Sequence, residues 1–224
     1  MDRIGDAFAW PFRDPDWVSK IVIMGLILLI PVVGAITALG WMLAALDRLR
    51  AGEERLPPAN FDHLGRGFRL FVVFFVYYLV LIAIAAAIYL PAVAILTQQG
   101  HDESSTNPFL VSLGLALSLL AFSFTTLASL LITFLTPAIV LAFDRGGIGA
   151  GLRLLEVLKS ARASLTYTLI AGLMLIAASV IAQLGSVACL IGVVFTTAYA
   201  LAMQAWIIRS FEVGATAPER SAPA

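Results

Sequence analysis

The sequence predicts an all-α fold, a polytopic transmembrane helical bundle, and two observations carry this prediction. First, the 224 residues are 61% hydrophobic and only 12% charged, whereas ordinary soluble proteins are about 25% charged. Second, four segments contain no Asp, Glu, Lys, Arg or His: 21–46, 70–100, 104–143 and 163–208. A bilayer core about 30 Å thick requires roughly 20 apolar residues per helix, so every segment is long enough to cross it.

We expect a single membrane domain over residues 1–211, because little sequence remains outside the apolar segments. Segment 163–208 is long enough for two helices and is predicted to turn near Gln183–Ser186. The tail 212–224 is small, polar and proline-containing, and is predicted to be disordered. The predicted spans are 70–97, 109–143, 165–182 and 187–208.

The first apolar segment, 21–46, is interrupted by Ile30-Pro31-Val32-Val33-Gly34. Proline removes a backbone donor and glycine weakens a helix, so the segment is predicted to break at 31–34. A single kinked span and a helical hairpin both fit this pattern. We favour the hairpin because it keeps the basic residues of 1–20 on the same side as those of 47–69. Each arm would be short, at roughly 15 residues or about 23 Å.

Residues 1–20 are predicted to form an interfacial segment with a short helix. Ile4, Ala7, Phe8 and Phe12 can share one face of that helix, and aromatic rings beside charges, such as Trp10 and Trp17, suit the level of the lipid headgroups. Asp14 is expected to cap the next helix, with Pro15 at its first position. An unstructured tail is the alternative for this segment.

Hydroxyl side chains recur along the segment 109–143. Ser118, Thr125, Ser129 and Thr136 fall within about 40° of one another on a helix. Small residues let helices approach closely in a membrane, which predicts a helix-packing face. A polar face lining a conduit is the alternative.

The distribution of basic residues predicts the topology. Lys and Arg are concentrated in loops 47–69 and 145–162, and none lies in the turns 98–108 or 183–187. The positive-inside rule therefore places both loops and the C-terminus in the cytoplasm of a multi-pass protein in the cell inner (plasma) membrane. Within the second loop, 148–162 is predicted to be an amphipathic surface helix, because Ile148, Leu152, Leu155 and Leu158 share one side of it.

Two cytoplasmic segments resemble each other. Residues 43–48 recur as 140–145, and 65–70 recur as 149–154, so each copy contains an Asp-Arg pair followed by a Gly-x-Gly sequence. Chance similarity is the alternative to a duplication. Each Asp is expected to be neutralised by the Arg that follows it.

Four arginines in and beside these repeats are candidates for binding lipid headgroups. Each Gly-x-Gly sequence is expected to open a helix, whose free backbone N–H groups favour anions. A basic residue near the surface contributes about 1 kcal/mol toward binding anionic lipid. Anchoring of the loops without a defined site is the alternative. The four candidates are Arg66, Arg69, Arg145 and Arg153.

Two further sequences carry a resemblance to a known family. The opening Trp10-Pro11-Phe12-Arg13-Asp14-Pro15-Asp16-Trp17 and the interruption Ile30-Pro31-Val32-Val33-Gly34 resemble prokaryotic membrane proteins grouped as domain of unknown function 4013. The resemblance covers about residues 10–211. It implies a multi-pass membrane protein, and it supplies no catalytic residues.

No motif in the sequence predicts an enzyme, a cofactor or a metal site. The glycines of 146–151 lack the Lys-Ser/Thr of a phosphate loop, and the spans carry no ionisable group for proton coupling. We therefore expect a non-catalytic integral membrane protein whose basic cytoplasmic face binds lipid, including anionic lipid, or a membrane partner such as a second copy, and no nucleic acid. A transporter or channel for a neutral or weakly polar solute is the alternative.

Overall fold

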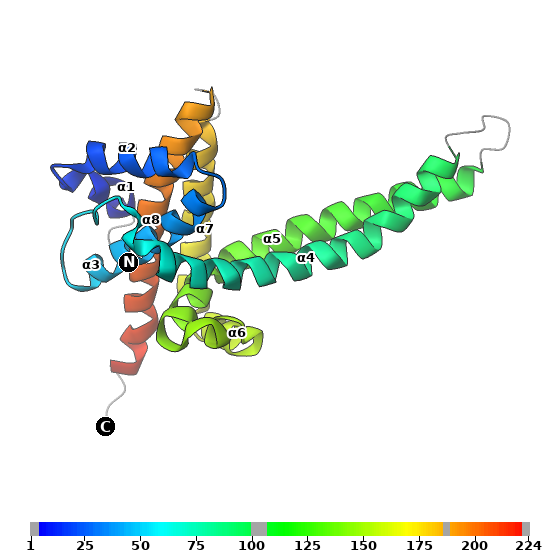
Figure 1. The fold of residues 1–224 in the computed structure, drawn as a ribbon. Coiled ribbons are helices and arrows are strands. Elements are labelled where there is room, and N and C mark those ends of the chain that lie inside the picture. The colour runs from blue at the N-terminus through cyan, green and yellow to red at the C-terminus, as the bar shows by residue number, and fades with distance from the viewer. Residues whose placement is uncertain (1–4, 100–106, 186–188, 221–224) are drawn as a thin grey trace. The chain divides into compact units, whose positions relative to one another are not determined.

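The computed structural model describes residues 5–99, 107–185 and 189–220, and throughout these residues the regular structure is helical (Figure 1). The all-α prediction is therefore confirmed. The elements in chain order are α1 Asp6–Ala9, the 3-10 helix η1 Trp10–Arg13, α2 Trp17–Leu28, α3 Val33–Arg50, the 3-10 helix η2 Phe61–His63, α4 Leu64–Gln99, α5 Pro108–Gly151, α6 Leu154–Ala163, α7 Leu165–Leu184 and α8 Cys189–Arg220.

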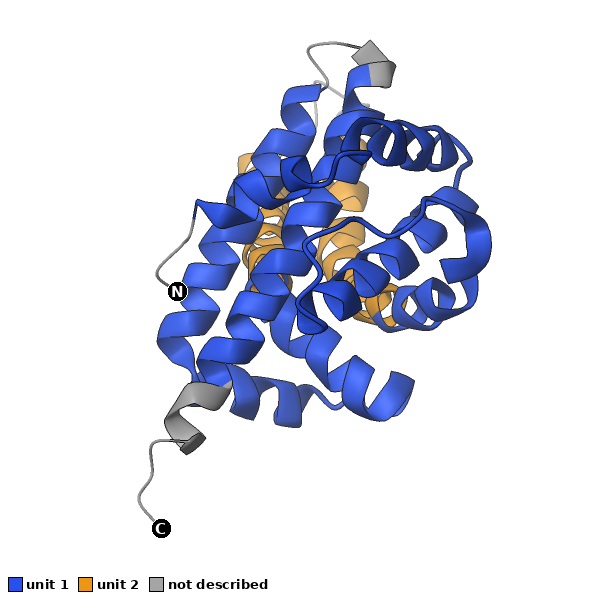
Figure 2. Cartoon of the chain, turned by 90° about the vertical axis from the view of Figure 1, so that its left-hand side faces the viewer, with its two compact units in different colours: residues 1–73, 133–224 blue, residues 74–132 orange. Residues whose placement is uncertain are grey.

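The helices gather in two compact units, coloured separately in Figure 2. Unit 1 comprises residues 1–73 and 133–224, and unit 2 comprises residues 74–132. Residues 1–211 were expected to form a single membrane domain, and α4 and α5 each belong partly to unit 1 and partly to unit 2. Unit 2 is a pair of long helices, and unit 1 holds the remaining elements.

The first apolar segment breaks where proline and glycine predicted a break. Helix α2 ends at Leu28 and α3 begins at Val33, while Val32 between them adopts a φ of 65°. A side chain at Gly34 would clash with the backbone of Ile27, so glycine lets the two helices meet closely. They pack against each other as a hairpin and do not form a single kinked helix. The 12 residues of α2 extend only about 18 Å, less than the thickness of a bilayer core.

Helix α3 lies in the core of unit 1, where α8 packs against both arms of the hairpin and against α7. Trp41 of α3 is fully buried, and its indole Nε1 donates to the Pro57 carbonyl at 3.0 Å. Helices α7 and α8 run side by side (Figure 1), and Thr196 Oγ1 of α8 donates to the Ala182 carbonyl of α7 at 2.8 Å. These hydrogen bonds satisfy polar groups that burial would otherwise leave without a partner.

The N-terminal segment packs on α8, which corrects the prediction of an interfacial segment for Trp10. The Trp10 side chain is fully buried, and its Nε1 donates to the Ala202 carbonyl at 3.2 Å. From α8, Tyr199 Oη donates to the Phe8 carbonyl at 2.6 Å. The indole therefore finds its hydrogen-bond partner inside the protein and not among lipid headgroups.

Asp14 connects the start of α2 to the loop after α3. Helix α2 begins at Trp17, so the predicted helix start at Pro15 is wrong. Asp14 nevertheless binds the backbone just before this helix, because its Oδ1 accepts a hydrogen bond from the Asp16 N–H at 2.9 Å. Asp14 Oδ2 accepts from Lys20 Nζ at 2.6 Å and from the Leu56 N–H at 2.8 Å. Burial alone would raise the pKa of the Asp14 carboxyl, but these hydrogen bonds and the Lys20 charge hold it below its ordinary value.

Three predicted spans coincide with helices that are long and apolar enough to cross a membrane. These helices cover Phe61–Gln99, Pro108–Gly151 and Leu165–Leu184. The fourth predicted span, 187–208, falls on α8, and its first two residues lie outside the described chain. Most of the predicted outer turn 98–108 also lies outside the described residues.

Two predicted segments have different bounds in the structure. The surface helix expected over 148–162 is α6, Leu154–Ala163, because residues up to Gly151 continue α5 beyond a break at Gly147, where φ is 71°. Within α6, Val157 is buried in the protein, whereas Leu155 is 82% exposed, as a side chain that faces lipid would be.

The disordered tail expected over 212–224 is wrong as far as Arg220, because α8 continues to that residue. Two contacts hold this part of the helix in unit 1. Glu212 pairs with Arg50, and the absence of a side chain at Gly214 lets the Tyr167 ring pack against α8. Residues 221–224 lie outside the described chain.

The backbone of helix α3 lies directly against the backbone of the first turn of α4. Substituting a glycine at this contact therefore tests how closely the two helices pack. A Cβ at Gly67 would clash with the Ile36 carbonyl oxygen, whereas a Cβ at Gly65, in the same turn, meets nothing within 4 Å. We expect Gly67→Ala to lower the free energy of unfolding by roughly 1–3 kcal/mol, the usual cost of overpacking. Gly65→Ala should be neutral or slightly stabilising. Thermal unfolding in one detergent compares them, and equal melting temperatures would contradict the close contact.

Candidate functional site

Six charged side chains join the ends of four helices in unit 1, and we call them the charge network. Helix α3 contributes two of them, α4 and α5 contribute one each, and α8 contributes two. Since each helix is charged only near this end, the network forms where the apolar segments stop. Its members are Asp47, Arg50, Arg66, Asp144, Arg209 and Glu212.

Arg50 lies at the centre of the charge network. Its Nε and Nη2 donate to the two carboxylate oxygens of Glu212 at 3.0 and 2.9 Å, and its Nη1 donates to Asp144 Oδ2 at 2.5 Å. Arg66 bridges the two aspartates, because Nη2 donates to Asp144 Oδ1 at 2.6 Å and Nη1 pairs with Asp47. Arg209 Nη1 donates to Glu212 Oε2 at 2.9 Å. The two-point contact between Arg50 and Glu212 fixes the direction of both side chains.

The charge network is held ionised by its own contacts. Burial alone would raise the pKa of the Glu212 carboxyl, but hydrogen bonds and charges from Arg50 and Arg209 hold the pKa below its ordinary value. The contribution of Glu212 to stability is therefore fully present above the unfolded value of about 4.3. It is lost as the pH falls through the lowered pKa of the folded state.

The expected pairing of each aspartate with the arginine that follows it is wrong. Asp47 and Asp144 bind Arg50 and Arg66, while Arg48 Nη1 donates to the Leu56 carbonyl at 3.1 Å. Successive residues on a helix point about 100° apart, so an adjacent arginine cannot face the same neighbour. Sequence spacing did carry a signal for Asp47, since Arg50 lies one helical turn further on.

Of the four arginines proposed for lipid headgroups, Arg66 and Arg69 line one hollow and the other two do not. Arg66 belongs to the charge network, and Arg69 lies on the exposed surface of the first turns of α4. Arg153 precedes α6 and pairs with Glu156 at 3.1 Å. Arg145 is exposed and makes no ion pair within the described residues. The second Gly-x-Gly sequence ends α5 and does not open a helix, so the two copies differ in structure.

A hollow with a volume of about 540 Å³ lies beside the charge network, and we call it the basic hollow. Two arginines reach it from α4, and the helix break at Gly147 forms part of its wall. Asp144 also faces it, but that carboxylate is already bound by Arg50 and Arg66. The hollow therefore offers a net positive charge to an anion. Its lining residues are Gly65, Arg66, Arg69, Phe143, Asp144 and Gly147.

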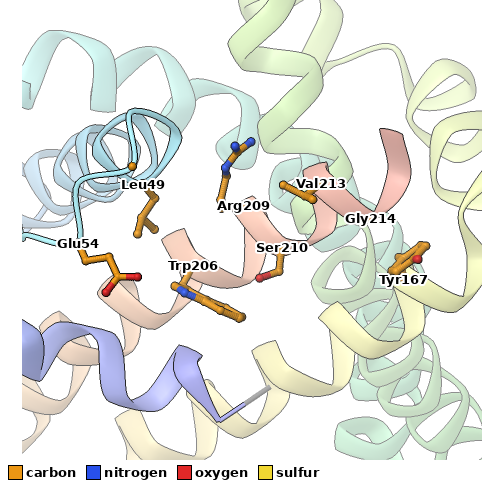
Figure 3. Close-up of a pocket in the computed structure, with 9 residues that line it drawn as sticks. Leu49, Glu54, Tyr167, Trp206, Arg209, Ser210, Val213 and Gly214 are labelled. Carbon is orange, nitrogen blue, oxygen red and sulfur yellow. The ribbon is translucent and has the colours of Figure 1, made fainter. Parts of the chain in front are cut away.

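A second pocket, with a volume of about 360 Å³, is shown in Figure 3, and we call it the aromatic pocket. It is lined by α3, the loop after α3, α7 and α8, all within unit 1. Trp206 and Tyr167 give it aromatic walls, while Glu54 and Arg209 give it one charge of each sign. Sequence reasoning missed this pocket because its residues come from four separate segments.

The hydroxyl face divides between the two units. Ser118 and Thr125 donate to the carbonyls four residues earlier in α5, at 2.9 and 2.8 Å, and Ser129 donates to the Thr126 carbonyl at 3.0 Å. These three residues lie in unit 2, whereas Thr136 lies in unit 1. Beside them, a Cβ at Gly114 would lie 2.7 Å from Leu96 Cγ of α4, so the two helices of unit 2 touch closely there.

No three His, Cys, Asp or Glu side chains come together in residues 5–99, 107–185 and 189–220 in a way that could hold a metal ion.

The chain matches a known family along most of its length. Residues 23–208 match the family described as protein of unknown function (DUF4013). The chain belongs to the DUF4013 family. This confirms the family that the sequence resembles, and the matched range includes the interruption of the first segment but begins after the opening residues 10–17. No curated protein and no solved structure matches the chain.

The geometry of the charge network predicts that Arg50 cannot be replaced by another cation. Arg50→Lys keeps the charge, but a lysine cannot bind Glu212 through two donors while also reaching Asp144. We expect the free energy of unfolding to fall by roughly 1.5–3 kcal/mol, the value of hydrogen bonds to charged groups. Arg55→Lys, in the exposed loop after α3, is the control and should leave the melting temperature unchanged. A similar melting temperature for both variants would show that the network does not stabilise the fold.

The contact between the two helices of unit 2 predicts the outcome of substitutions on α5. Ser118→Leu adds volume on the face that carries Gly114, whereas Leu119→Phe adds volume to a side chain that is 67% exposed. We expect Ser118→Leu to cost about 1–3 kcal/mol through overpacking and Leu119→Phe to cost little. Melting in detergent tests this, and equal effects would argue against a packed seam.

Proposed function

We propose that this DUF4013 protein is a non-catalytic, multi-pass protein of the cell inner (plasma) membrane, and that its basic hollow binds the phosphate of an anionic lipid. The observation that carries the proposal is the hollow lined by Arg66 and Arg69, of which Arg69 makes no ion pair within the described residues. A guanidinium presents several donors in a plane and suits phosphate oxygens. Arg69 is therefore available to a ligand, while Arg66 is held in place by the charge network.

The balance of charge around the hollow supports the same proposal. In the described loops, the carboxylates of Asp47, Asp144 and Glu156 are paired with arginines, while those of Glu53 and Asp62 make no ion pair. A surplus of basic groups, each without an ion pair in the part of the chain that the structure describes, remains near the helix ends. Such a surplus attracts anionic headgroups, at about 1 kcal/mol for each basic residue near the surface. These residues are Arg55, Arg69, Arg145, Lys159 and Arg162.

The charge network supports a common side for three regions of the chain. Arg50 after the apolar part of α3 contacts Asp144 near the end of α5 and Glu212 of α8. Loops 47–69 and 145–162 and the C-terminal part of α8 therefore begin at the same level in unit 1. The positive-inside rule then favours the cytoplasm for all three. A membrane partner or a second copy of the chain is the alternative ligand of this basic face.

The alternative function, a transporter or channel for a neutral or weakly polar solute, has less support. It depends on a hydroxyl face that lines a conduit. Ser118, Thr125 and Ser129 instead donate to carbonyls of their own helix. Hydroxyls bonded in this way need no water or solute as a partner, which favours the packing interpretation.

Arg69→Gln tests the proposed lipid site without disturbing the charge network. We expect the wild-type protein to retain phosphatidylglycerol or cardiolipin in native mass spectrometry, saturating as lipid is added, and the variant to lose most of this retention. Arg162→Gln, which removes one exposed charge from α6, is the matched control and should lose only the small general contribution of a surface charge. Equal loss in both variants would indicate general surface charge, and unchanged retention in Arg69→Gln would refute the site.

A further inference from the structure

The aromatic pocket carries opposite charges on two of its walls. Glu54 comes from the loop after α3 and Arg209 comes from α8, and Figure 3 shows Trp206 lying between Glu54 and Tyr167. Glu54 binds Arg13 through Oε2, at 2.6 Å, which leaves Oε1 open to another donor. Arg209 binds Glu212 through Nη1 and keeps its other N–H groups. Each charge is thus fixed by a neighbour yet able to bind a ligand.

Uncharged donors complete the lining of the pocket. The Trp206 indole N–H and the hydroxyls of Tyr167 and Ser210 have no hydrogen-bond partner among the described residues. The indoles of Trp10 and Trp41, by contrast, each donate to a backbone carbonyl. Trp206 is half-buried, so its N–H is open to the pocket and can donate to a ligand there.

The position of the pocket along the helices agrees with the depth of lipid headgroups. Tyr167 is the third residue of α7, a helix long and apolar enough to cross a membrane. Leu49 and Arg209 line the same pocket; Arg209 belongs to the charge network and Leu49 precedes its member Arg50, where the apolar segments end. Tryptophan and tyrosine are enriched at this level of membrane proteins. The volume of about 360 Å³ lies at the lower end of the range for small-molecule pockets.

We propose that the aromatic pocket binds a zwitterionic phospholipid headgroup, which carries an ammonium and a phosphate. The ammonium binds Glu54 and the face of the neighbouring Trp206, since aromatic rings attract cations within about 6 Å. The phosphate binds Arg209, with Ser210 and the Trp206 N–H as further donors. A purely anionic headgroup would face the Glu54 carboxylate without an ammonium to match it. The pocket shares no lining residue with the basic hollow, so the two lipid sites are independent.

The test compares short-chain phosphatidylethanolamine and phosphatidylcholine with phosphatidylglycerol, each titrated into the full-length protein in detergent. Binding is read as the tryptophan fluorescence change that Trp206→Phe abolishes, and is checked by native mass spectrometry. We expect the two zwitterionic lipids to bind more tightly than phosphatidylglycerol. Equal affinity for all three, or a fluorescence change that persists in Trp206→Phe, would overturn the proposal.

Glu54→Gln has a matched control in Arg13→Gln. Both variants break the same ion pair, but only the first removes the carboxylate from the pocket. We expect Glu54→Gln to weaken zwitterionic binding by about tenfold, as for the loss of one charge-assisted hydrogen bond, and to abolish the preference over phosphatidylglycerol. Arg13→Gln should keep the preference over phosphatidylglycerol, with a smaller loss of affinity because Glu54 is no longer held in place. An unchanged preference in Glu54→Gln would overturn the assignment of the ammonium.

Two further arms separate this site from others. Soluble phosphoethanolamine carries the same two charges without acyl chains. If it displaces the zwitterionic lipid, the pocket recognises the headgroup alone and can bind the free zwitterion as well. If it does not displace the lipid, the pocket requires the acyl chains and binds lipid only. Arg69→Gln should leave zwitterionic binding unchanged, since Arg69 lies in the basic hollow. A loss of zwitterionic binding in Arg69→Gln would refute a separate aromatic pocket.

Discussion

The two guanidinium groups that share Asp144 determine how the helix ends of unit 1 meet. Arg50 reaches this carboxylate from α3 and Arg66 reaches it from α4, while Glu212 of α8 binds the far side of Arg50. The Asp144 side chain is 14% exposed and that of Glu212 is 16% exposed, so both carboxylates depend on these partners. Half-buried ion pairs add little net stability when complete, but breaking one leaves a charge that burial penalises. The network therefore fixes the register of the four helices.

Both candidate binding sites follow from that register. The basic hollow lies on one side of Asp144 and Arg66, and it contains the next basic residue of α4, Arg69. The aromatic pocket uses Arg209, which binds the same carboxylate as Arg50. A guanidinium held by one carboxylate keeps its direction, so less conformational entropy is lost when a ligand binds its remaining donors.

The N-terminal segment serves the same part of unit 1. Trp10 and Tyr199 attach it to α8, and Asp14 attaches the start of α2 to Leu56 in the loop after α3. The ion pair between Arg13 and Glu54 then joins this segment to the wall of the aromatic pocket. A loop that would otherwise be mobile is thus held by buried hydrogen bonds at several points.

The sequence alone determined the fold class, the break at Pro31–Gly34, the apolar helices α4, α5 and α7, and the family, because apolar length and helix-breaking residues act locally. Only the tertiary structure decided which charges meet. Several arginines follow Asp47 in the sequence, and no local pattern shows that Asp47 pairs with Arg50 and Arg66 and not with Arg48. The burial of Trp10 depends on a distant partner, the Ala202 carbonyl of α8, which no local pattern predicts. The helical state of residues 212–220 also depends on packing, because a short polar segment is not a stable helix by itself. The two pockets depend on side chains from separate segments, so no sequence window contains either of them.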